Sequence, residues 1–363
     1  MIVDKGINLW NKAKKIIPGG TQLLSKRSEM FLPDQWPSYY KKAKGLKLWD
    51  LNDNEFIDMS SMGIGSCILG YADEDVNNAV KKTIEDGSMS TLNCYEEVEL
   101  AELLLKINKW ADMVRYTRTG GEAMALAVRL GRAYSKKDKV AFCGYHGWHD
   151  WYLSSNLADD KNLDGHLLSG LEPIGVPRKL KGTAIPFSYN KINELKEIID
   201  KHDIGTIVVE PIRHKKPKND FLKNIKRYAE EIGAVLIFDE VSSGWRLNVG
   251  GAHELFDCYP DIAVYGKGMS NGYPMAAVVG KRDIMDMAQL SFISSTYWTE
   301  RIGPSASLST INKMLEKDVP KHLSKIGNMI GKGWKKIADK HDISIDLMDE
   351  MAPLIAFSFN KSI

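Results

Sequence analysis

Short apolar runs alternate with amphipathic segments through the middle of the chain. Six runs of four or five residues are dominated by apolar side chains, at 113–117, 139–143, 206–209, 234–238, 262–265 and 276–279. Between them, apolar residues recur at helical spacing, at 122–134, 190–201, 222–232 and 283–290. Apolar runs without polar alternation are typical of strands buried on both faces. The rhythm therefore predicts an α/β fold, with a mostly parallel central sheet covered by helices on both sides.

The two ends of the chain have a different pattern. An amphipathic helix pattern at Lys5–Ile16 stops at Pro18-Gly19-Gly20, and two short alternating runs around Asn52-Asp53-Asn54 predict a hairpin. Further helical patterns cover 73–85, 96–107, 299–315 and 319–340, and a last strand-like run covers 353–359. We expect three parts: an N-terminal segment with part of a small α+β lobe (1–75), a large domain (76–318), and the start of a C-terminal small domain (319–363).

Composition narrows the classes of function. The 363 residues include 49 Lys and Arg against 47 Asp and Glu, which gives no indication of nucleic acid or an anionic membrane as a partner. No apolar run approaches the roughly 20 residues that a spanning helix needs. The four cysteines are scattered and form no CxxC pair, which favours thiols in a cytoplasmic protein over disulfides or a metal site.

Two candidate reactive residues end neighbouring apolar runs. Asp239 closes the run 234–238, and Lys267 lies between two glycines after the run 262–265. In open α/β sheets, ligands bind at the carboxyl ends of strands. A desolvated lysine is a Schiff-base nucleophile, and pyridoxal phosphate needs both such a lysine and an acid partner for its ring nitrogen. Asp239 could instead cap a helix, and Lys267 could belong to a surface turn; the pairing of the two favours the cofactor.

A phosphate site is predicted where a strand leads into a helix. Thr119-Gly120-Gly121 follows the run 113–117 and precedes an Ala-rich helical pattern, so its N–H groups and the Thr119 hydroxyl are suited to a phosphate. A Thr-Gly-Gly sequence alone is more often only a turn. Three further candidates follow strands: Tyr145, whose ring could stack on the cofactor, His146, and Glu210. His149 is interpreted as a hydrogen-bonded, partly buried histidine.

Taken in order, these motifs resemble class-III aminotransferases, and most closely their glutamate-1-semialdehyde aminomutase branch. The likeness runs from Pro18-Gly19-Gly20 to about Leu315. Its most specific stretch is Phe238-Asp-Glu-Val-Ser-Ser-Gly-Trp-Arg246, followed by Gly250-Gly251, Pro260-Asp261, Tyr265-Gly-Lys267-Gly, Pro274 and Gly280-Lys-Arg-Asp-Ile-Met285. The resemblance implies the fold-type-I fold of pyridoxal-phosphate transferases and a homodimer whose active sites lie at the interface.

The resemblance also implies roles for single residues. Lys267 would carry pyridoxal 5′-phosphate as a Schiff base, and Asp239 would pair with the pyridine nitrogen. Val241 and Tyr145 would pack on opposite faces of the ring. Gly120 and Gly121 would bind the phosphate through backbone N–H groups, and Thr296 would supply a hydroxyl to the phosphate of the neighbouring subunit.

Three departures from the family pattern bear on the substrate and the cofactor. The family's Ser-Gly-Thr is Thr119-Gly120-Gly121 here, so one phosphate-binding hydroxyl is missing, and Arg118 could compensate with its charge. The carboxylate-binding arginine of the aminomutase aligns with Lys26, next to Arg27, and its substrate-side tryptophan aligns near Ile64. An unrelated sequence at 153–171 replaces a mobile loop of the aminomutase. The chain stops at Ile363 while relatives continue, so either the sequence is a shortened piece or the C-terminal small domain is trimmed.

The favoured function is therefore amino-group transfer between a small-molecule amino donor and a carbonyl acceptor, with a tilt toward substrates larger than glutamate semialdehyde. An aminomutase, which moves the amino group within one molecule, is the alternative within the same chemistry. A racemase or decarboxylase on this fold is less favoured. An inactive relative that acts as a binding protein is the alternative outside catalysis, and the presence of the Lys, Asp and Tyr together disfavours it.

Overall fold

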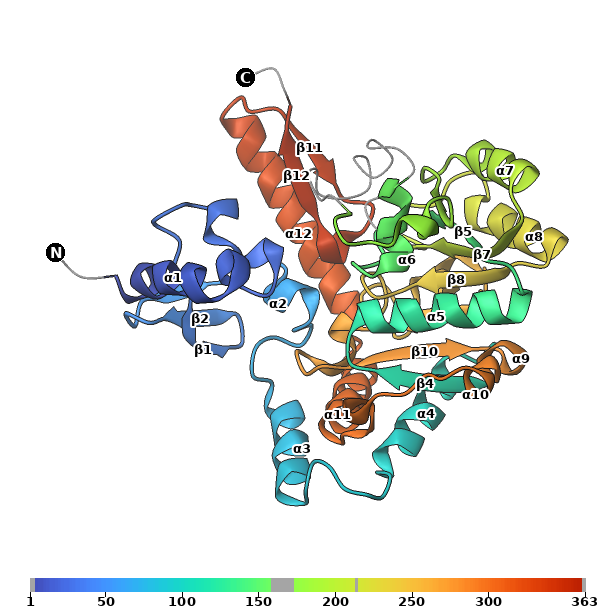
Figure 1. The fold of residues 1–363 in the computed structure, drawn as a ribbon. Helices are drawn as coiled ribbons and strands as arrows, with labels where there is room; N and C mark the ends of the chain where they lie inside the picture. Colours follow the sequence, from blue (N-terminus) through green and yellow to red (C-terminus); the bar gives the residue numbers. More distant parts are fainter. Residues whose placement is uncertain (1–3, 158–172, 213–214, 361–363) are drawn as a thin grey trace.

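The computed structural model describes residues 4–157, 173–212 and 215–360, and its centre is a seven-stranded sheet (Figure 1). The strand order is β4-β10-β9-β8-β7-β5-β6. The strands are β4 (Met113–Thr117), β5 (Lys139–Cys143), β6 (Ala184–Pro186), β7 (Ile204–Val209), β8 (Val235–Asp239), β9 (Ile262–Tyr265) and β10 (Ala276–Gly280). All run parallel except β10, which is antiparallel to both of its neighbours.

Both faces of this sheet are buried. Along β8, Val235 and Ile237 pack into one apolar cluster, while Leu236 and Phe238 pack into another on the opposite face. The same alternation holds along β7, β9 and β10. Because successive side chains of a strand point to opposite faces, a continuous apolar run is what two covered faces require.

Helices from both sides cover the sheet. One cluster combines the sheet with α5 (Gly120–Ser135), α9 (Arg282–Met285) and α10 (Met287–Leu290). The opposite face is covered by α7 (Ile192–Lys201) and α8 (Phe221–Ile232) over one part, and by α4 (Glu96–Ile107) and α11 (Ile302–Lys317) over another. The short helix α6 (Asp150–Leu153) follows β5, and α3 (Glu74–Glu85) packs on α11. The parallel strands thus end in loops beyond the helical layers, where a site can form.

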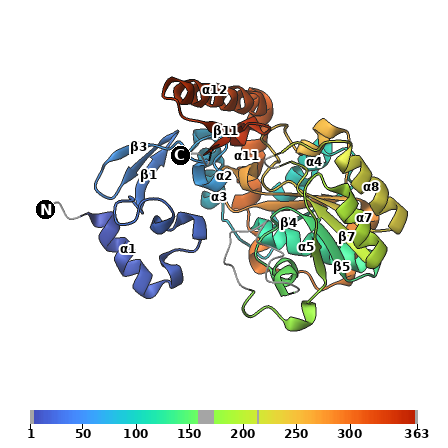
Figure 2. The ribbon, with the colours of Figure 1, turned by 90° about the horizontal axis from the view of Figure 1, so that it is seen from above.

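The N-terminal segment lies beside this body, as Figure 2 shows in blue. It contains α1 (Lys5–Ile16), the three-stranded antiparallel sheet β1 (Tyr40–Lys44), β2 (Lys47–Asp50) and β3 (Glu55–Ile57), and the short helix α2 (Met62–Gly65). Asp4 begins α1 by accepting a hydrogen bond from the N–H of Ile7 at 3.0 Å. The segment ends in α2, whose residues contact the turn that follows β9.

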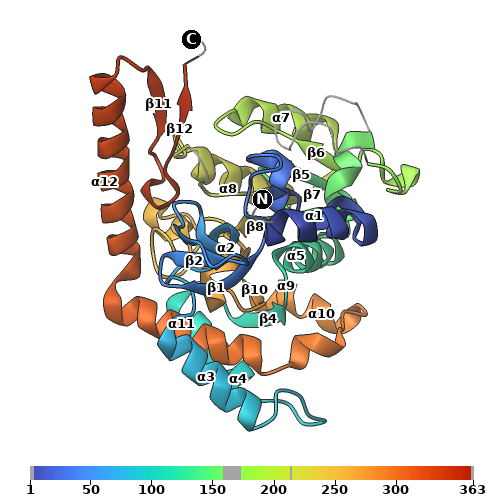
Figure 3. The ribbon, with the colours of Figure 1, turned by 90° about the vertical axis from the view of Figure 1, so that its left-hand side faces the viewer.

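The C-terminal elements form a second peripheral unit. Helix α12 (Val319–Lys340) carries the antiparallel hairpin β11 (Ile345–Met348) and β12 (Ala356–Phe359) along its side (Figure 3). Asp318 separates α12 from α11 because it adopts a left-handed conformation (φ +47°), and Pro320 lies in the first turn of α12. No described helix has the length and the apolar character needed to cross a membrane.

The predicted fold class is confirmed, and the differences have physical reasons. The direction of β10 could not be predicted, since alternation does not encode strand direction. The segment 283–290 forms two short helices rather than one, and 353–359 begins with a 3-10 turn at Ala352–Leu354 because Pro353 cannot donate to a ladder. Strands β1, β6 and β11 were not predicted. The three-part division stays a prediction, and most of the segment 153–171 lies outside the described residues.

Candidate active site

The carboxyl ends of the parallel strands bring the predicted residues to one edge of the sheet. Strand β4 also opens toward this edge, because both β4 and β9 are antiparallel to the strand between them. The residues delivered there are Gly120 after β4, Tyr145 and His146 after β5, Glu210 after β7, Asp239 at the end of β8 and Lys267 after β9.

Asp239 is a buried carboxylate with two oriented oxygens. Its Oδ2 lies 2.8 Å from Nδ1 of His146, and its Oδ1 accepts a hydrogen bond from the N–H of Val241 at 3.0 Å. The two residues are only 3% and 1% exposed. His146 therefore lies behind Asp239 and contacts it directly, which makes it a residue that orients the carboxylate. A carboxylate has about four lone-pair sites, so these two contacts leave acceptor capacity for a ligand.

Lys267 occupies a strained position two residues after β9. Its backbone has φ +43°, in the left-handed region that favours glycine. Its Nζ donates a hydrogen bond to Oγ of Ser242, on the turn that follows β8. Left-handed non-glycine residues cost about 1–3 kcal/mol and cluster at functional sites. The hydrogen bond to Ser242 places the amine beside the turn at the end of β8.

Val241 joins the lysine turn to the start of α5. A Cβ atom added to Gly120 would lie 3.0 Å from Cγ1 of Val241, and one added to Gly266 would lie 3.6 Å from the same atom. The first distance is tighter than nine in ten real contacts. Glycine at 120 therefore lets the backbone of α5 approach the β8 turn closely, as a ligand-binding loop requires.

At the start of α5, the Thr119 hydroxyl caps the helix, whereas the sequence predicted it as a phosphate ligand. The Thr119 hydroxyl accepts a hydrogen bond from the N–H of Glu122 at 3.3 Å, and Oε2 of Glu122 accepts the Thr119 N–H at 2.8 Å. This reciprocal capping box uses the hydroxyl that was predicted for phosphate. Among the described residues, no acceptor is found for the N–H groups of Gly120 and Gly121 at this helix start.

Tyr145 and Glu210 form a second pair. The Tyr145 side chain is 40% exposed, and its ring packs edge-on against Tyr152 at 5.9 Å. Its backbone N–H donates to Oε2 of the buried Glu210 at 3.0 Å. Glu210 thus fixes the backbone that presents the partly exposed Tyr145 ring.

A cavity of about 240 Å³ lies next to the lysine turn. It is lined by residues of α2 and its flanks, by Arg246, and by α12 and the turn before β12. Arg246 is 5% exposed, and burial lowers its pKa to about 10. Its guanidinium donates to the backbone carbonyls of Ser242 and Gly65. Gly65 is also close to Lys267, whose Cδ would lie 3.8 Å from a Cβ at that glycine. Arg246 therefore ties α2 to the turn after β8, beside Lys267.

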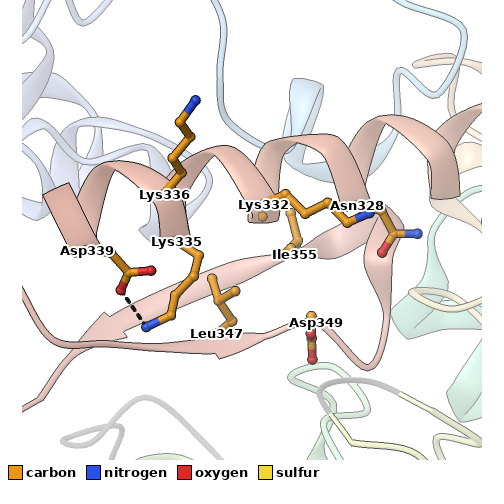
Figure 4. A pocket seen from close by; sticks show the side chains of 9 residues that line it. Asn328, Lys332, Lys335, Lys336, Asp339, Leu347, Asp349 and Ile355 are labelled. Atoms are coloured by element: carbon orange, nitrogen blue, oxygen red, sulfur yellow. Dashed lines mark ion pairs between the residues drawn. The ribbon is translucent and has the colours of Figure 1, made fainter.

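A second cavity, of about 450 Å³, is not part of this site. It lies between α12 and the β11–β12 hairpin, and Figure 4 shows its lysine-rich lining with the Lys335–Asp339 ion pair of 2.8 Å. None of the residues at the carboxyl edge of the sheet lines it.

Thr296 lies on an exposed segment that is tied to the start of α5. It begins the 3-10 turn Thr296–Thr299, and the Arg118 guanidinium holds that segment by donating to the carbonyls of Trp298 and Glu300 at 3.0 and 2.8 Å. Arg118 also pairs with the Glu300 carboxylate at 2.8 Å. These contacts engage the Arg118 guanidinium with the Thr296 segment, and its contribution to the phosphate site stays a prediction.

The structure thus gathers Lys267, Asp239, Val241 and the Gly120–Gly121 turn, with Tyr145 presented beside them. It places His146 and Glu210 as supports of Asp239 and Tyr145. Sequence reasoning did not assign Ser242 or Arg246, although both lie within the motif quoted for the family. Their contacts join residues 25 and 181 positions apart, so spacing alone could not find them. The Thr119-x-x-Glu122 capping signature was readable from the sequence.

Known proteins resemble this chain over most of its length. The profile of the class-III aminotransferases matches residues 33–361. A glutamate-1-semialdehyde 2,1-aminomutase of Fusobacterium nucleatum is 33% identical, over 99% of this chain and 83% of its own. A 3-aminobutyryl-CoA aminotransferase of Cloacimonas acidaminovorans is 31% identical, over 94% of this chain and 80% of its own.

Solved structures show the same fold. The FumI protein of Sphingopyxis sp. MTA144, in its PLP internal aldimine form, superposes with a TM-score of 0.87 at 22% identity, over 98% of this chain and 83% of its own. A glutamate-1-semialdehyde aminomutase of Pseudomonas aeruginosa PAO1 gives 0.81 at 17% identity, over 98% and 80%.

The site fits the cofactor that class-III aminotransferases use, pyridoxal 5′-phosphate. It offers a lysine amine, a buried carboxylate, two glycine N–H groups at a helix start and a half-exposed aromatic ring. Close packing against Val241 explains why position 120 carries no side chain. Among the described residues, no group of three or more His, Cys, Asp or Glu side chains is arranged to hold a metal ion. The chain belongs to the class-III aminotransferase family, a family of enzymes that use pyridoxal 5′-phosphate.

Proposed function

We propose that the protein moves an amino group from a small-molecule donor to a carbonyl acceptor, with pyridoxal 5′-phosphate attached to Lys267. The observation that carries the proposal is the convergence of Lys267, Ser242 and Asp239 at adjacent strand ends. Nζ of Lys267 donates to Ser242, and Asp239 lies at the end of the neighbouring strand with His146 behind it. A strained lysine next to an oriented buried carboxylate is the arrangement that this chemistry needs.

Two side chains hold or move protons in this reaction. When bound, the cofactor supplies a carbon that accepts the amino group and a ring that withdraws electrons from the reacting carbon. Lys267 Nζ takes the proton from the amine-bearing carbon of the substrate and later returns one, as general base and acid. The Ser242 hydroxyl keeps this amine at the strand ends. The Asp239 carboxylate holds the proton of the pyridine nitrogen, and His146 fixes its orientation through the contact to Oδ2.

Other residues bind and orient. Gly120 and Gly121 direct N–H groups at the phosphate from the positive end of the α5 dipole. Val241 and Tyr145 would hold the cofactor ring between them. Thr296 supplies a hydroxyl to the phosphate from the partner subunit, and Thr119 acts by capping the helix.

Intramolecular transfer, as in an aminomutase, is the second candidate, and the curated aminomutase relatives favour it. The local structure favours transfer between two molecules. Lys26 aligns with the carboxylate-binding arginine of the aminomutase. It ends the short 3-10 turn Leu24–Lys26, in which no residue is buried. The guanidinium of the neighbouring Arg27 lies against Gly19. Ile64, near which the substrate-side tryptophan aligns, adopts φ +56°, a strained value for a β-branched residue.

We also propose a cytoplasmic homodimer with shared sites. The segment around Thr296 exposes apolar side chains such as Leu290, Phe292 and Tyr297, of which Tyr297 is 72% exposed. Contiguous exposed apolar residues mark protein interfaces. A two-fold interface is the commonest assembly of soluble chains, and sedimentation of the holoenzyme at a dimer mass is the expected result. The four cysteines are free thiols, in keeping with a reducing compartment.

The proposed activity is tested by a half-reaction screen. The holoenzyme is mixed with one amino donor at a time, and the visible absorption band of the bound cofactor is followed. A true donor removes the band, and a carbonyl acceptor restores it while appearing as the aminated product. Conversion of glutamate semialdehyde without any added donor or acceptor would instead establish the aminomutase.

A further inference from the structure

Gly121 has a steric partner in His149. A Cβ atom added to Gly121 would lie 2.8 Å from Cε1 and 3.0 Å from Nδ1 of the His149 ring. Real Cβ atoms essentially never come closer than 3.0 Å to another heavy atom in this way. The imidazole edge therefore occupies the space in which any side chain at position 121 would begin. Glycine at 121 and histidine at 149 are complementary.

The His149 ring is held in place but keeps a polar atom unused. It lies on Trp148 with ring centroids 4.7 Å apart and begins the turn into α6. Among the described residues, its buried Nδ1 has no hydrogen-bond partner, and Nδ1 and Cε1 form the ring edge that faces Gly121. Buried polar atoms are normally satisfied, so such an atom calls for a ligand or another explanation.

In the part of the chain that the structure describes, the Thr119 and Arg118 side chains at the start of α5 are engaged elsewhere. The Thr119 hydroxyl is engaged with Glu122, Arg118 is engaged with Glu300 and two backbone carbonyls, and Gly121 has no side chain. The class-III pattern has a hydroxyl residue at position 121. The His149 ring, on the loop after β5, occupies the space beside Gly121 where that hydroxyl residue would begin.

We propose that His149 is a ligand of the cofactor phosphate and replaces, through Nδ1–H, the side-chain hydroxyl that Gly121 lacks. The proposal rests on the proposed cofactor site at the start of α5. The ring donates one hydrogen bond to a phosphate oxygen, beside the N–H groups of Gly120 and Gly121. A hydrogen bond to a charged group gives this contact a measurable share of the cofactor affinity.

The ring is suited to donate as a neutral group. Burial lowers the pKa of His149, although Glu122 on α5 and Asp150 on α6 oppose the shift. A neutral imidazole carries one N–H, and the tautomer with the hydrogen on Nδ1 directs that N–H at the space over Gly121. The contact therefore needs no second proton.

The experiment compares pyridoxal 5′-phosphate with pyridoxal, which lacks the phosphate. Cofactor is removed from the protein, and rebinding of each compound is titrated by tryptophan fluorescence. His149→Ala is expected to weaken binding of pyridoxal phosphate roughly 10- to 100-fold and to leave pyridoxal binding unchanged. Inorganic phosphate should compete with the cofactor in the wild type and compete less well in the variant. His202→Ala, a histidine change beside Lys139 and away from the site, is the matched control and should change neither value.

A double variant tests whether a hydroxyl at position 121 can take over the role of the His149 ring. Gly121→Thr alone places its side chain against His149 and should also weaken binding. Combined with His149→Ala, the threonine has room, and affinity for pyridoxal phosphate should return to within about threefold of the wild type. Equal losses for pyridoxal phosphate and pyridoxal, no loss for either, or a double variant no better than His149→Ala would overturn the assignment. A wild type that binds no pyridoxal phosphate would instead refute the proposed function.

Discussion

Replacing Asp239 by asparagine separates its chemical role from its structural one. The carboxylate accepts the Val241 N–H at 3.0 Å and contacts His146 Nδ1 at 2.8 Å. The asparagine carbonyl keeps the first contact. Its NH₂ group faces Nδ1, which can accept if the ring proton moves to Nε2, an atom without a partner among the described residues. The folding cost is then about one hydrogen bond, roughly 1 kcal/mol, or a Tm decrease of roughly 2 °C.

The effect on rate is expected to be much larger. Without the carboxylate, the pyridine nitrogen is unprotonated for much of the time and withdraws electrons less well. Preorganised electrostatic groups of this kind contribute about 3–4 kcal/mol, so kcat should fall roughly a hundred- to a thousand-fold.

The assay pairs steady-state kinetics with thermal unfolding of the same holoenzyme. Asp261→Asn is the matched control: that carboxylate accepts the Leu236 N–H at 2.9 Å and pairs with Lys281 at 2.7 Å, next to the amino end of β9. It should lower stability without changing kcat. Near-full kcat in Asp239→Asn would show that Asp239 only supports the strand end.

Two further changes test the phosphate side of the site. Gly120→Ala places a Cβ 3.0 Å from Val241, so the start of α5 must shift; cofactor affinity should fall by about 1–3 kcal/mol, and an unchanged titration would show that the contact relaxes freely. Thr296→Ala should cost about 1.5–3 kcal/mol of cofactor affinity. In a mixed dimer with Lys267→Ala subunits, the site that keeps Lys267 should bind cofactor like the wild type; affinity equal to that of the Thr296→Ala homodimer would rule out sharing across the interface.

Local patterns predicted much of the fold, because burial on both faces leaves a clear signature. β4, β5 and β9 occur at the predicted residues, and α4 and α12 at theirs. The edge strand β6 was not predictable because it pairs only three residues with β5. The antiparallel direction of β10 was not predictable because an apolar run does not encode strand direction.

The positions of Asp239 and Lys267 at strand ends were predictable, because a motif fixes each of them there. The site was not predictable where contacts cross the fold. The Ser242–Lys267 bond, the Arg246–Gly65 clamp and the His149–Gly121 contact each join separate loops. Thr119 shows the reverse case, in which a residue suited to phosphate caps its own helix instead.

The central claim is that Lys267 carries the cofactor, and chemical trapping tests it most directly. Borohydride reduction of the holoenzyme makes the lysine–cofactor bond permanent, and peptide mapping then locates the modified lysine. The account predicts one modified peptide, with the pyridoxyl group on Lys267, and no modification of that peptide in Lys267→Ala. Modification of another lysine, such as Lys281, with Lys267 untouched would contradict it.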